Sequence, residues 1–276
     1  MPLALRTALA EAELAADEAG VIALAGSGKA RDVARKQSTS DLVTEFDLAV
    51  ERAIVKRLAA AFPEDAIIGE EGTGDVASAR DRLWYIDPID GTTNFAHGLP
   101  FFCTSIGLVD ALGPAVGVID APALGWRFTA LRGEGAYLRE RGGPPRRLAV
   151  SSTASLQGAL LATGFPYDLR TSSADNVAAF AELQRAGQAV RRVGAAALDL
   201  AMVAAGWFDG YWEQKLKPWD VAAGLLLVAE AGGRQSGYDG KAVQLSSGSV
   251  VATNGHIHDE LLAVLARVEG RSEALS

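Results

Sequence analysis

Residues 84–95 read Trp84-Tyr85-Ile86-Asp87-Pro88-Ile89-Asp90-Gly91-Thr92-Thr93-Asn94-Phe95. An apolar strand leads here into two acids on either side of a proline, and a Gly-Thr-Thr turn follows. Because buried carboxylates are costly unless a positive group neutralises them, we expect a hard cation beside Asp87 and Asp90. The turn offers backbone N–H groups and hydroxyls to an anion. A cation site next to an anion site is what metal-assisted phosphate chemistry needs.

The rest of the chain is long enough to bury a large core around this segment. It has 276 residues and a mass of 28.8 kDa, with 49% hydrophobic and 22% charged residues. This composition is typical of a globular protein, with one large domain or two tightly joined halves. The turn-rich segment 141–145 suggests subdomains of about 1–145 and 146–276 within a single domain over 1–276.

The charge balance limits the classes of partner. The net charge is −8 and the pI about 5.0, whereas a nucleic-acid binder usually carries a basic surface, so we expect no nucleic-acid partner. Small anionic substrates remain compatible, because metal ions can reverse the local sign of charge. Acidic residues interrupt the N-terminal segment, and the apolar stretch Val221–Ala229 is too short to span a bilayer. We therefore expect no membrane partner and a cytoplasmic location.

The chain offers few soft metal ligands. Cys103 is the only cysteine and there are three histidines, so no disulfide can form within the chain and no thiolate zinc site can be built. We interpret Cys103 as a buried small hydrophobe and His97 as a structural residue.

Periodicity and turn signals predict alternating helices and strands, an α/β fold class. The expected helices span residues 3–25, 44–62, 174–186, 195–205, 218–230 and 259–268. The expected strands span residues 67–70, 83–86, 103–109, 115–119, 127–131, 136–138, 159–163, 210–213 and 250–253. Thr44 followed by Asp47 resembles a capping box. The locally basic segment 29–40 is either a solvated loop or a flap over an anion.

Four acids stand at the ends of predicted elements, where α/β folds often bind ligands at one edge of a sheet: Glu70, Asp87, Asp90 and Asp220. A set of oxygen ligands selects Mg²⁺, Mn²⁺ or Ca²⁺ over zinc or copper. Each acid taken alone could instead be a surface residue or a helix cap, and Asp220 in particular could serve the positive end of its helix.

Further polar residues each have two interpretations. Gly91 and Thr92 form either an ordinary Asp-Gly turn or a phosphate cradle whose hydroxyl orients a water. Asp47 caps its own helix, helps Thr92 to take a proton, or does both. Glu213 is either a salt-bridge partner at the edge of the core or an acceptor for substrate hydroxyls.

With these residues, the chain resembles the inositol monophosphatases, within the lithium-sensitive, Mg²⁺-dependent phosphatase superfamily. The resemblance spans nearly the whole chain and keeps the family's order and approximate spacing. Its four blocks are Asp41-Leu42-Val43-Thr44 with Asp47, Gly69-Glu70-Glu71, Asp87-Pro88-Ile89-Asp90-Gly91-Thr92-Thr93-Asn94-Phe95 and Trp219-Asp220-Val221-Ala222-Ala223-Gly224. The third block is highly specific for the superfamily but does not choose among its subfamilies.

The resemblance implies a site for two or three Mg²⁺ ions. Glu70, Asp87 and the carbonyl of Ile89 would hold the first ion, and Asp87, Asp90 and Asp220 the second. A weaker third ion would lie near Glu70.

The resemblance also implies catalytic and substrate-binding residues. Thr92 and Asp47, with Glu70, would activate the water. The Gly91 and Thr92 amides would bind the phosphate, and Lys36 would belong to a mobile flap. Further substrate contacts are implied for Asp90, Gly194, Ala195, Ala196, Glu213 and Asp220.

The implied reaction is in-line hydrolysis of a phosphate monoester by a metal-activated water, with inositol 1-phosphate as the expected substrate. The implied fold is the layered αβαβα sandwich of the sugar phosphatases, usually a homodimer, and lithium inhibition is expected. Fructose-1,6-bisphosphatase, histidinol-phosphatase and 3′(2′),5′-bisphosphate nucleotidase activities remain alternatives, and so does dual activity. A non-catalytic, metal-binding interaction protein is the alternative from a different class.

Overall fold

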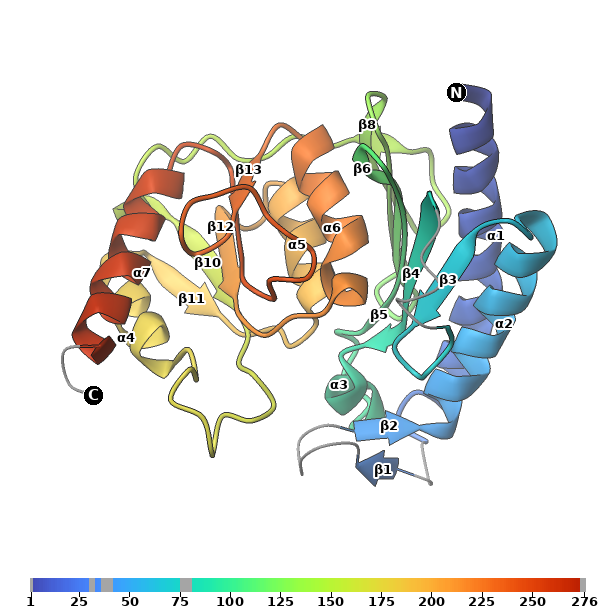
Figure 1. Cartoon of the computed structure of the whole chain (residues 1–276), viewed down its shortest axis with the longest axis horizontal. Helices are drawn as coiled ribbons and strands as arrows, with labels where there is room; N and C mark the ends of the chain where they lie inside the picture. The colour runs from blue at the N-terminus through green and yellow to red at the C-terminus, as the bar shows by residue number, and fades with distance from the viewer. Residues whose placement is uncertain (1, 30–32, 36–41, 75–80, 274–276) are drawn as a thin grey trace.

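The computed structural model describes residues 2–29, 33–35, 42–74 and 81–273, which form five layers (Figure 1). Helices α4 (Val177–Ala186) and α7 (His258–Glu273) cover the outer face of the smaller sheet. Helices α5 (Ala196–Ala204) and α6 (Pro218–Glu230) lie between the two sheets. Helices α1 (Pro2–Gly26) and α2 (Glu45–Ala61) pack on the far face of the larger sheet. The expected αβαβα sandwich is confirmed.

The larger sheet has seven strands in the order β3-β4-β5-β6-β7-β8-β9. Its neighbours pair antiparallel, except for the parallel pair β3 and β4. The strands are β3 (Ala66–Gly69), β4 (Arg82–Asp90), β5 (Cys103–Asp110), β6 (Gly113–Ala121), β7 (Trp126–Leu131), β8 (Gly135–Glu140) and β9 (Arg146–Arg147).

The smaller sheet has five strands in the order β11-β10-β12-β14-β13. Strand β10 runs parallel to both of its neighbours, whereas β14 is antiparallel to β12 and β13. The strands are β10 (Leu160–Thr163), β11 (Ala189–Arg191), β12 (Gly210–Glu213), β13 (Arg234–Ser236) and β14 (Val250–Thr253). A separate two-stranded ribbon pairs β1 (Val33–Arg35) with β2 (Leu42–Thr44).

All the predicted helices and strands are present, but several boundaries differ. Strand β4 continues through Asp90, so the two acids lie within the strand rather than after it. The predicted turn after Asp90 is a short helix, α3 (Thr92–Ala96), which begins after Gly91 at φ 89°. Helix α4 begins at Val177 rather than at residue 174. The prediction missed β1, β2, β9, β11 and β13, because strands of two or three residues depend on their partners rather than on a periodic pattern.

Small residues let α6 approach the larger sheet closely. A Cβ atom built on Gly107 would lie 2.9 Å from the Cβ of Ala222, and one on Gly117 would lie 2.9 Å from the carbonyl oxygen of Ala223. Only glycine allows this approach of backbone to helix. The close packing brings the first turn of α6 to the edge of the sheet where β4 carries its acids.

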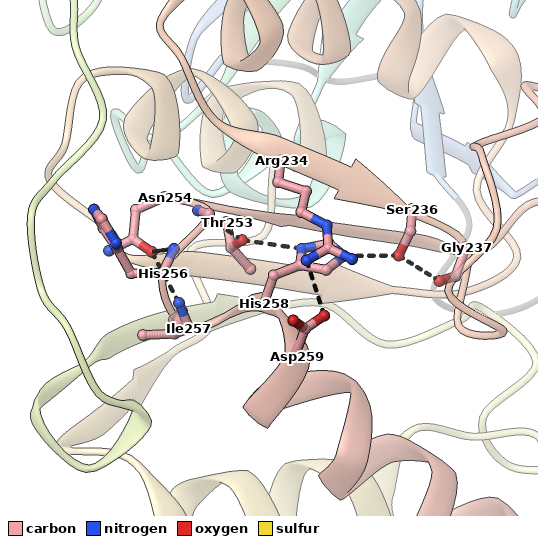
Figure 2. A network of polar contacts seen from close by, with 10 residues as sticks. Arg234, Ser236, Gly237, Thr253, Asn254, His256, Ile257, His258 and Asp259 are labelled. Atoms are coloured by element: carbon pink, nitrogen blue, oxygen red, sulfur yellow. Dashed lines mark hydrogen bonds and ion pairs between the residues drawn. The ribbon is translucent and has the colours of Figure 1, made fainter.

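A buried polar network fixes the start of α7 against β13 and β14 (Figure 2). The Ser236 hydroxyl donates to the carbonyl of Gly237 and lies 3.0 Å from Nε2 of His258, so that nitrogen donates to Ser236. The other ring nitrogen, Nδ1, then accepts from the hydroxyl of Thr253 at 3.0 Å. Because Nε2 carries the proton and the side chains are fully buried, this serine and histidine form a structural network rather than a nucleophile and base.

Candidate active site

A cavity of about 410 Å³ lies where ends of the two sheets meet the N-termini of α3, α5 and α6. It gathers residues from five separate parts of the chain. Among the predicted site residues, those that line it are Glu70, Asp87, Ile89, Asp90, Gly91, Thr92, Gly194, Ala195, Ala196, Glu213 and Asp220. Asp47 lies behind Thr92, and Lys36 lies outside the described residues.

A bulge in β4 turns both of its acids toward this cavity. Residues three positions apart in a regular strand point to opposite faces of the sheet. Asp87 pairs with Ser105 and Asp90 pairs with Cys103, so β4 carries one extra residue between these two pairs. The extra residue re-aims the side chains that follow, which is a recurrent use of bulges beside active sites.

Asp87 is the most deeply buried of the acids that line the cavity, with 2% of its surface exposed. Its Oδ1 has no hydrogen-bond partner among the described residues. Burial, followed by the charges of Glu70 and Asp90, raises its pKa well above the usual range for aspartate. A buried carboxylate oxygen without a partner, beside other carboxylates, fits a bound cation.

Asp90 lies at the N-terminus of α5. Its Oδ2 accepts a hydrogen bond from the amide of Ala197 at 2.6 Å, and the Cys103 thiol donates to the same oxygen at 3.7 Å. Burial raises the pKa of Asp90 to about 7, although the Ala197 hydrogen bond opposes this rise. Cys103 is buried, as expected, but it is also a polar neighbour of the site rather than only a small hydrophobe.

Asp220 both caps a helix and lines the cavity. Its Oδ2 accepts from the amide of Lys217 at 2.6 Å, at the first turn of α6. Burial and then the charge of Glu70 raise its pKa well above the usual range. The helix-cap interpretation is therefore confirmed, and the carboxylate also lines the cavity, whereas its role as a metal ligand stays a prediction.

Asp47 likewise uses its two oxygens for two tasks. Oδ2 accepts from the amide and the hydroxyl of Thr44, at 2.8 Å and 2.5 Å, which completes the predicted capping box of α2. Oδ1 lies 3.4 Å from Oγ1 of Thr92. The Thr92 hydroxyl also lies 3.1 Å from the carbonyl oxygen of Ile89, so it can donate to either oxygen. This arrangement is a hydroxyl at a cavity wall with a carboxylate behind it.

The turn that carries Glu70 is held by Glu51, a residue that the sequence analysis did not select. Glu51 belongs to α2 and only 3% of its surface is exposed. Its carboxylate accepts from the amides of Glu71 and Thr73 at 2.8 Å and 3.2 Å, and from the Thr73 hydroxyl at 2.6 Å. The sequence contained one indication of this role, because Glu51 follows Val50 directly and lies near the apolar face of the predicted helix over 44–62.

The carboxylates line one cavity without forming a finished ligand cluster. Within the described ranges, no three acidic, histidine or cysteine side chains already have the arrangement of a metal site. Two of the carboxylates, Asp90 and Asp220, accept hydrogen bonds from backbone amides instead. The donor set is entirely oxygen, which suits Mg²⁺ and related hard cations.

Cations on the cavity rim were also missed by the sequence analysis. Arg192, Lys215 and Lys217 line the cavity together with Trp219. Lys215 forms an ion pair with Asp168 at 2.7 Å. No motif marks these residues, since the loop after β12 and the chain before α5 meet only in the folded protein.

Comparison with known proteins gives a consistent result. The profile of the inositol monophosphatase family matches residues 5–269. An inositol-1-monophosphatase from Synechocystis sp. is 44% identical over 240 residues, covering 87% of this chain and 82% of that protein. The Nus factor SuhB from Pseudomonas aeruginosa is 45% identical over 236 residues, covering 83% of this chain and 84% of that protein.

Solved structures agree with the sequence comparison. The inositol monophosphatase from Anabaena (Nostoc) sp. is similar with a TM-score of 0.84 and 40% identity. The match covers 95% of this chain and 96% of that chain. A further relative, from Thermotoga maritima, is named a fructose-1,6-bisphosphatase/inositol-1-monophosphatase and is 38% identical over 87% of this chain and 89% of its own length.

Proposed function

The chain belongs to the inositol monophosphatase family and is a phosphoric monoester hydrolase, and from this premise we propose that it hydrolyses inositol 1-phosphate in a Mg²⁺-dependent reaction. The observation that carries the proposal is the buried Oδ1 of Asp87, which has no hydrogen-bond partner among the described residues and lies on a cavity shared with four further carboxylates. Without a cation, this concentration of negative charge would repel a phosphate ester.

Glu70, Asp87, Asp90 and Asp220, with the carbonyl of Ile89, would hold the metal, as two or three Mg²⁺ ions. When bound, Mg²⁺ lowers the pKa of a water and neutralises charge on the leaving oxygen. The family is metal-dependent in general, and the choice of Mg²⁺ rests on the all-oxygen donor set of this cavity.

Thr92 and Asp47 would manage the proton of the attacking water. The Thr92 hydroxyl can accept a hydrogen bond from the water while it donates its own proton toward Oδ1 of Asp47, 3.4 Å away. A proton that leaves the water therefore has a path through one hydroxyl to a buried carboxylate. The neighbouring amides of Gly91 and Thr92, at the cavity wall, would bind the phosphate oxygens.

Glu213, Ala195 and Ala196 would contact the leaving group, since they line the same cavity. A carboxylate oxygen accepts hydrogen bonds from hydroxyls, and Glu213 therefore suits a polyol. Asp90 and Asp220 line the same cavity and would also contribute to substrate binding.

The test is phosphate release with and without Mg²⁺ from a substrate panel. The panel contains inositol 1-phosphate, fructose 1,6-bisphosphate, histidinol phosphate and 3′-phosphoadenosine 5′-phosphate. A clear preference for inositol 1-phosphate is expected. A preference for another ester would move the substrate assignment, and release that is independent of divalent metal would overturn the role of the carboxylates.

Dual activity is the second candidate, because one relative is named for both fructose-1,6-bisphosphatase and inositol-1-monophosphatase activity. The same panel decides it, since comparable kcat/KM values for the two esters would establish dual activity.

A non-catalytic role is the other alternative, and one relative of this chain is named as a Nus factor, SuhB, rather than as an enzyme. A Thr92→Ala variant that lost turnover and kept a cellular function would support that role.

Lithium inhibition, the homodimer, the cytoplasmic location and the absence of a nucleic-acid partner stay predictions. Phosphate release in millimolar Li⁺, light scattering after gel filtration and a nucleic-acid mobility-shift assay test three of them directly. Among the helices that the structure describes, none combines the length and the apolar character that crossing a bilayer requires.

A further inference from the structure

Tyr211 and Glu213 lie on the same face of β12, two positions apart. Tyr211 is fully buried in the core that contains α5 and α6, whereas Glu213 is half-buried and lines the cavity. The Tyr211 hydroxyl donates to Oε2 of Glu213 at 2.5 Å. Oε1 of Glu213 accepts no hydrogen bond from the described residues, so one oxygen of this carboxylate is occupied and the other is left for a ligand.

Gly164 lies so close to the Glu213 carboxylate that this group has little room to rotate. It follows β10 directly and also lines the cavity. A Cβ atom at position 164 would overlap the Glu213 carboxyl group, so the glycine backbone packs directly against it. The carboxylate is therefore confined between this backbone and the Tyr211 hydroxyl.

Buried hydrogen bonds hold these two strand ends together. Thr163 of β10 pairs with Trp212 of β12, and the Thr163 hydroxyl donates to the Trp212 carbonyl at 2.6 Å. Asn176, 5% exposed, donates to the Gly164 carbonyl at 2.7 Å and accepts from the Trp212 indole at 2.9 Å. These bonds fix the position of Gly164 relative to Glu213, so the confinement does not depend on exposed or mobile groups.

We infer that Tyr211 is a positioning residue for substrate specificity, which with Gly164 orients Glu213 so that Oε1 accepts a hydroxyl of the leaving group. The inference rests on the proposed function, because it assigns the selection of a polyol ester to that same cavity. Burial, and then the charges of Glu213 and Asp199, raise the pKa of Tyr211 well above its usual range. The phenol therefore stays protonated and remains a donor to Glu213 throughout the neutral pH range.

The test compares Tyr211→Phe with the unaltered protein on two esters in Mg²⁺. Inositol 1-phosphate presents hydroxyls to Glu213, whereas phenyl phosphate has none. We expect KM for inositol 1-phosphate to rise about tenfold, as for the loss of one well-placed hydrogen bond, with kcat within about twofold. Both parameters for phenyl phosphate should stay unchanged. In a Glu213→Ala background, Tyr211→Phe should have no further effect on KM.

The matched control is Tyr137→Phe on β8, which removes a hydroxyl of a half-buried residue that donates to the Glu134 carbonyl and does not line the cavity. It should leave KM unchanged for both esters. An equal rise in KM for both esters with Tyr211→Phe, or additive effects with Glu213→Ala, would overturn the inference. If the unaltered protein hydrolyses phenyl phosphate but not inositol 1-phosphate, the proposed substrate is wrong, and this result is separate from the test of Tyr211. The comparison then uses the polyol phosphate that the protein does hydrolyse, with the same expected difference.

Discussion

Several residues at the cavity make structural contacts in addition to the catalytic roles proposed for them. Asp47 uses one oxygen to cap α2 and directs the other toward Thr92, and Asp220 caps α6 at the cavity wall. Removing such a side chain would therefore disturb both stability and turnover. Conservative substitutions that keep the acceptor and remove the charge separate the two effects.

Asp90→Asn is such a substitution. Asparagine keeps an acceptor for the Ala197 amide but removes one charge from the metal site, so the fold should persist. Because a bound metal contributes several kcal/mol of charge stabilisation, we expect turnover to fall at least about a hundredfold. Phosphate release and thermal unfolding measure the two effects. The control is Asp239→Asn, an exposed carboxylate in an ion pair with Lys241. Near-normal rates in Asp90→Asn would contradict the assignment of Asp90 as a ligand.

Glu51→Gln tests the support of the Glu70 turn. The amide end of glutamine would face N–H and hydroxyl donors that now bind a carboxylate. We expect about 1–3 kcal/mol lower stability from the unsatisfied donors, and a Mg²⁺ requirement raised about tenfold or more. The magnesium dependence of phosphate release and calorimetric unfolding are the measurements. The control is Glu140→Gln, at an exposed position at the end of β8, which should change neither the stability nor the Mg²⁺ requirement. An unchanged Mg²⁺ requirement in Glu51→Gln would contradict the role of Glu51 in supporting the Glu70 turn.

At the scale of elements, the two central helices depend on the absence of side chains. A Cβ atom on Gly224 of α6 would lie 2.6 Å from the Cβ of Leu200 on α5. Helix propensity alone would favour alanine at this position, so glycine here reflects tertiary packing rather than local preference.

Gly224→Ala should therefore destabilise the protein by about 1–3 kcal/mol, because an extra methyl group in a packed core forces helix displacement. Gly270→Ala in α7 is the matched control. A Cβ atom there meets nothing within 4 Å, so this helix position should gain about 0.5–1 kcal/mol from alanine. Chemical denaturation of both variants measures whether the free energy of unfolding falls in Gly224→Ala and rises in Gly270→Ala. Stabilisation by both substitutions would show that α5 and α6 can separate at no cost.

The start of α7 gives an acid-sensitive element. Burial, and then the charge of Arg234, lower the pKa of His258 to about 4. The unfolded chain, with an ordinary histidine pKa near 6.5, takes up the proton first. The contribution of His258 to the free energy of unfolding is therefore fully present above pH 6.5. It is lost as the pH falls toward 4, and the loss is at most about 3 kcal/mol.

Denaturant unfolding between pH 7 and pH 4 checks this dependence. In His258→Gln the loss of stability over this range should be smaller, although the variant is less stable at pH 7 because its network is broken (Figure 2). His97→Gln, which changes an exposed histidine at the end of α3, should reproduce the original pH dependence. An identical slope in His258→Gln would exclude this histidine as its source.

At the scale of the molecule, one apolar core joins both sheets through α5 and α6. It contains Phe128 and Leu138 from the larger sheet and Tyr211 and Ala252 from the smaller sheet. The single domain over residues 1–276, with a subdomain boundary near residue 145, stays a prediction, which this shared core supports. We expect one cooperative unfolding transition, with coincident midpoints by far-ultraviolet circular dichroism and tryptophan fluorescence. Two separated midpoints would instead support two independently stable halves.

The sequence predicted most of the long elements because their periodicity is local. The helix over 44–62, with its Thr44 cap, and the helix over 218–230 have strong end signals, and the structure has both nearly as expected. Short strands such as β11 and β13 gave no such signal, since a three-residue strand is defined by its neighbours. Glu51 and Arg192 were missed because their neighbours at the site come from distant segments of the chain.

The sequence by itself determined the chemistry: an all-oxygen set of acids, a Gly-Thr turn and the block order of a known family are all local patterns. Only the tertiary structure decided the geometry. The bulge between Asp87 and Asp90 turns both acids to one cavity, although their spacing alone would separate them. The physical reason is that side-chain direction depends on strand pairing and helix packing, which join residues far apart in the chain.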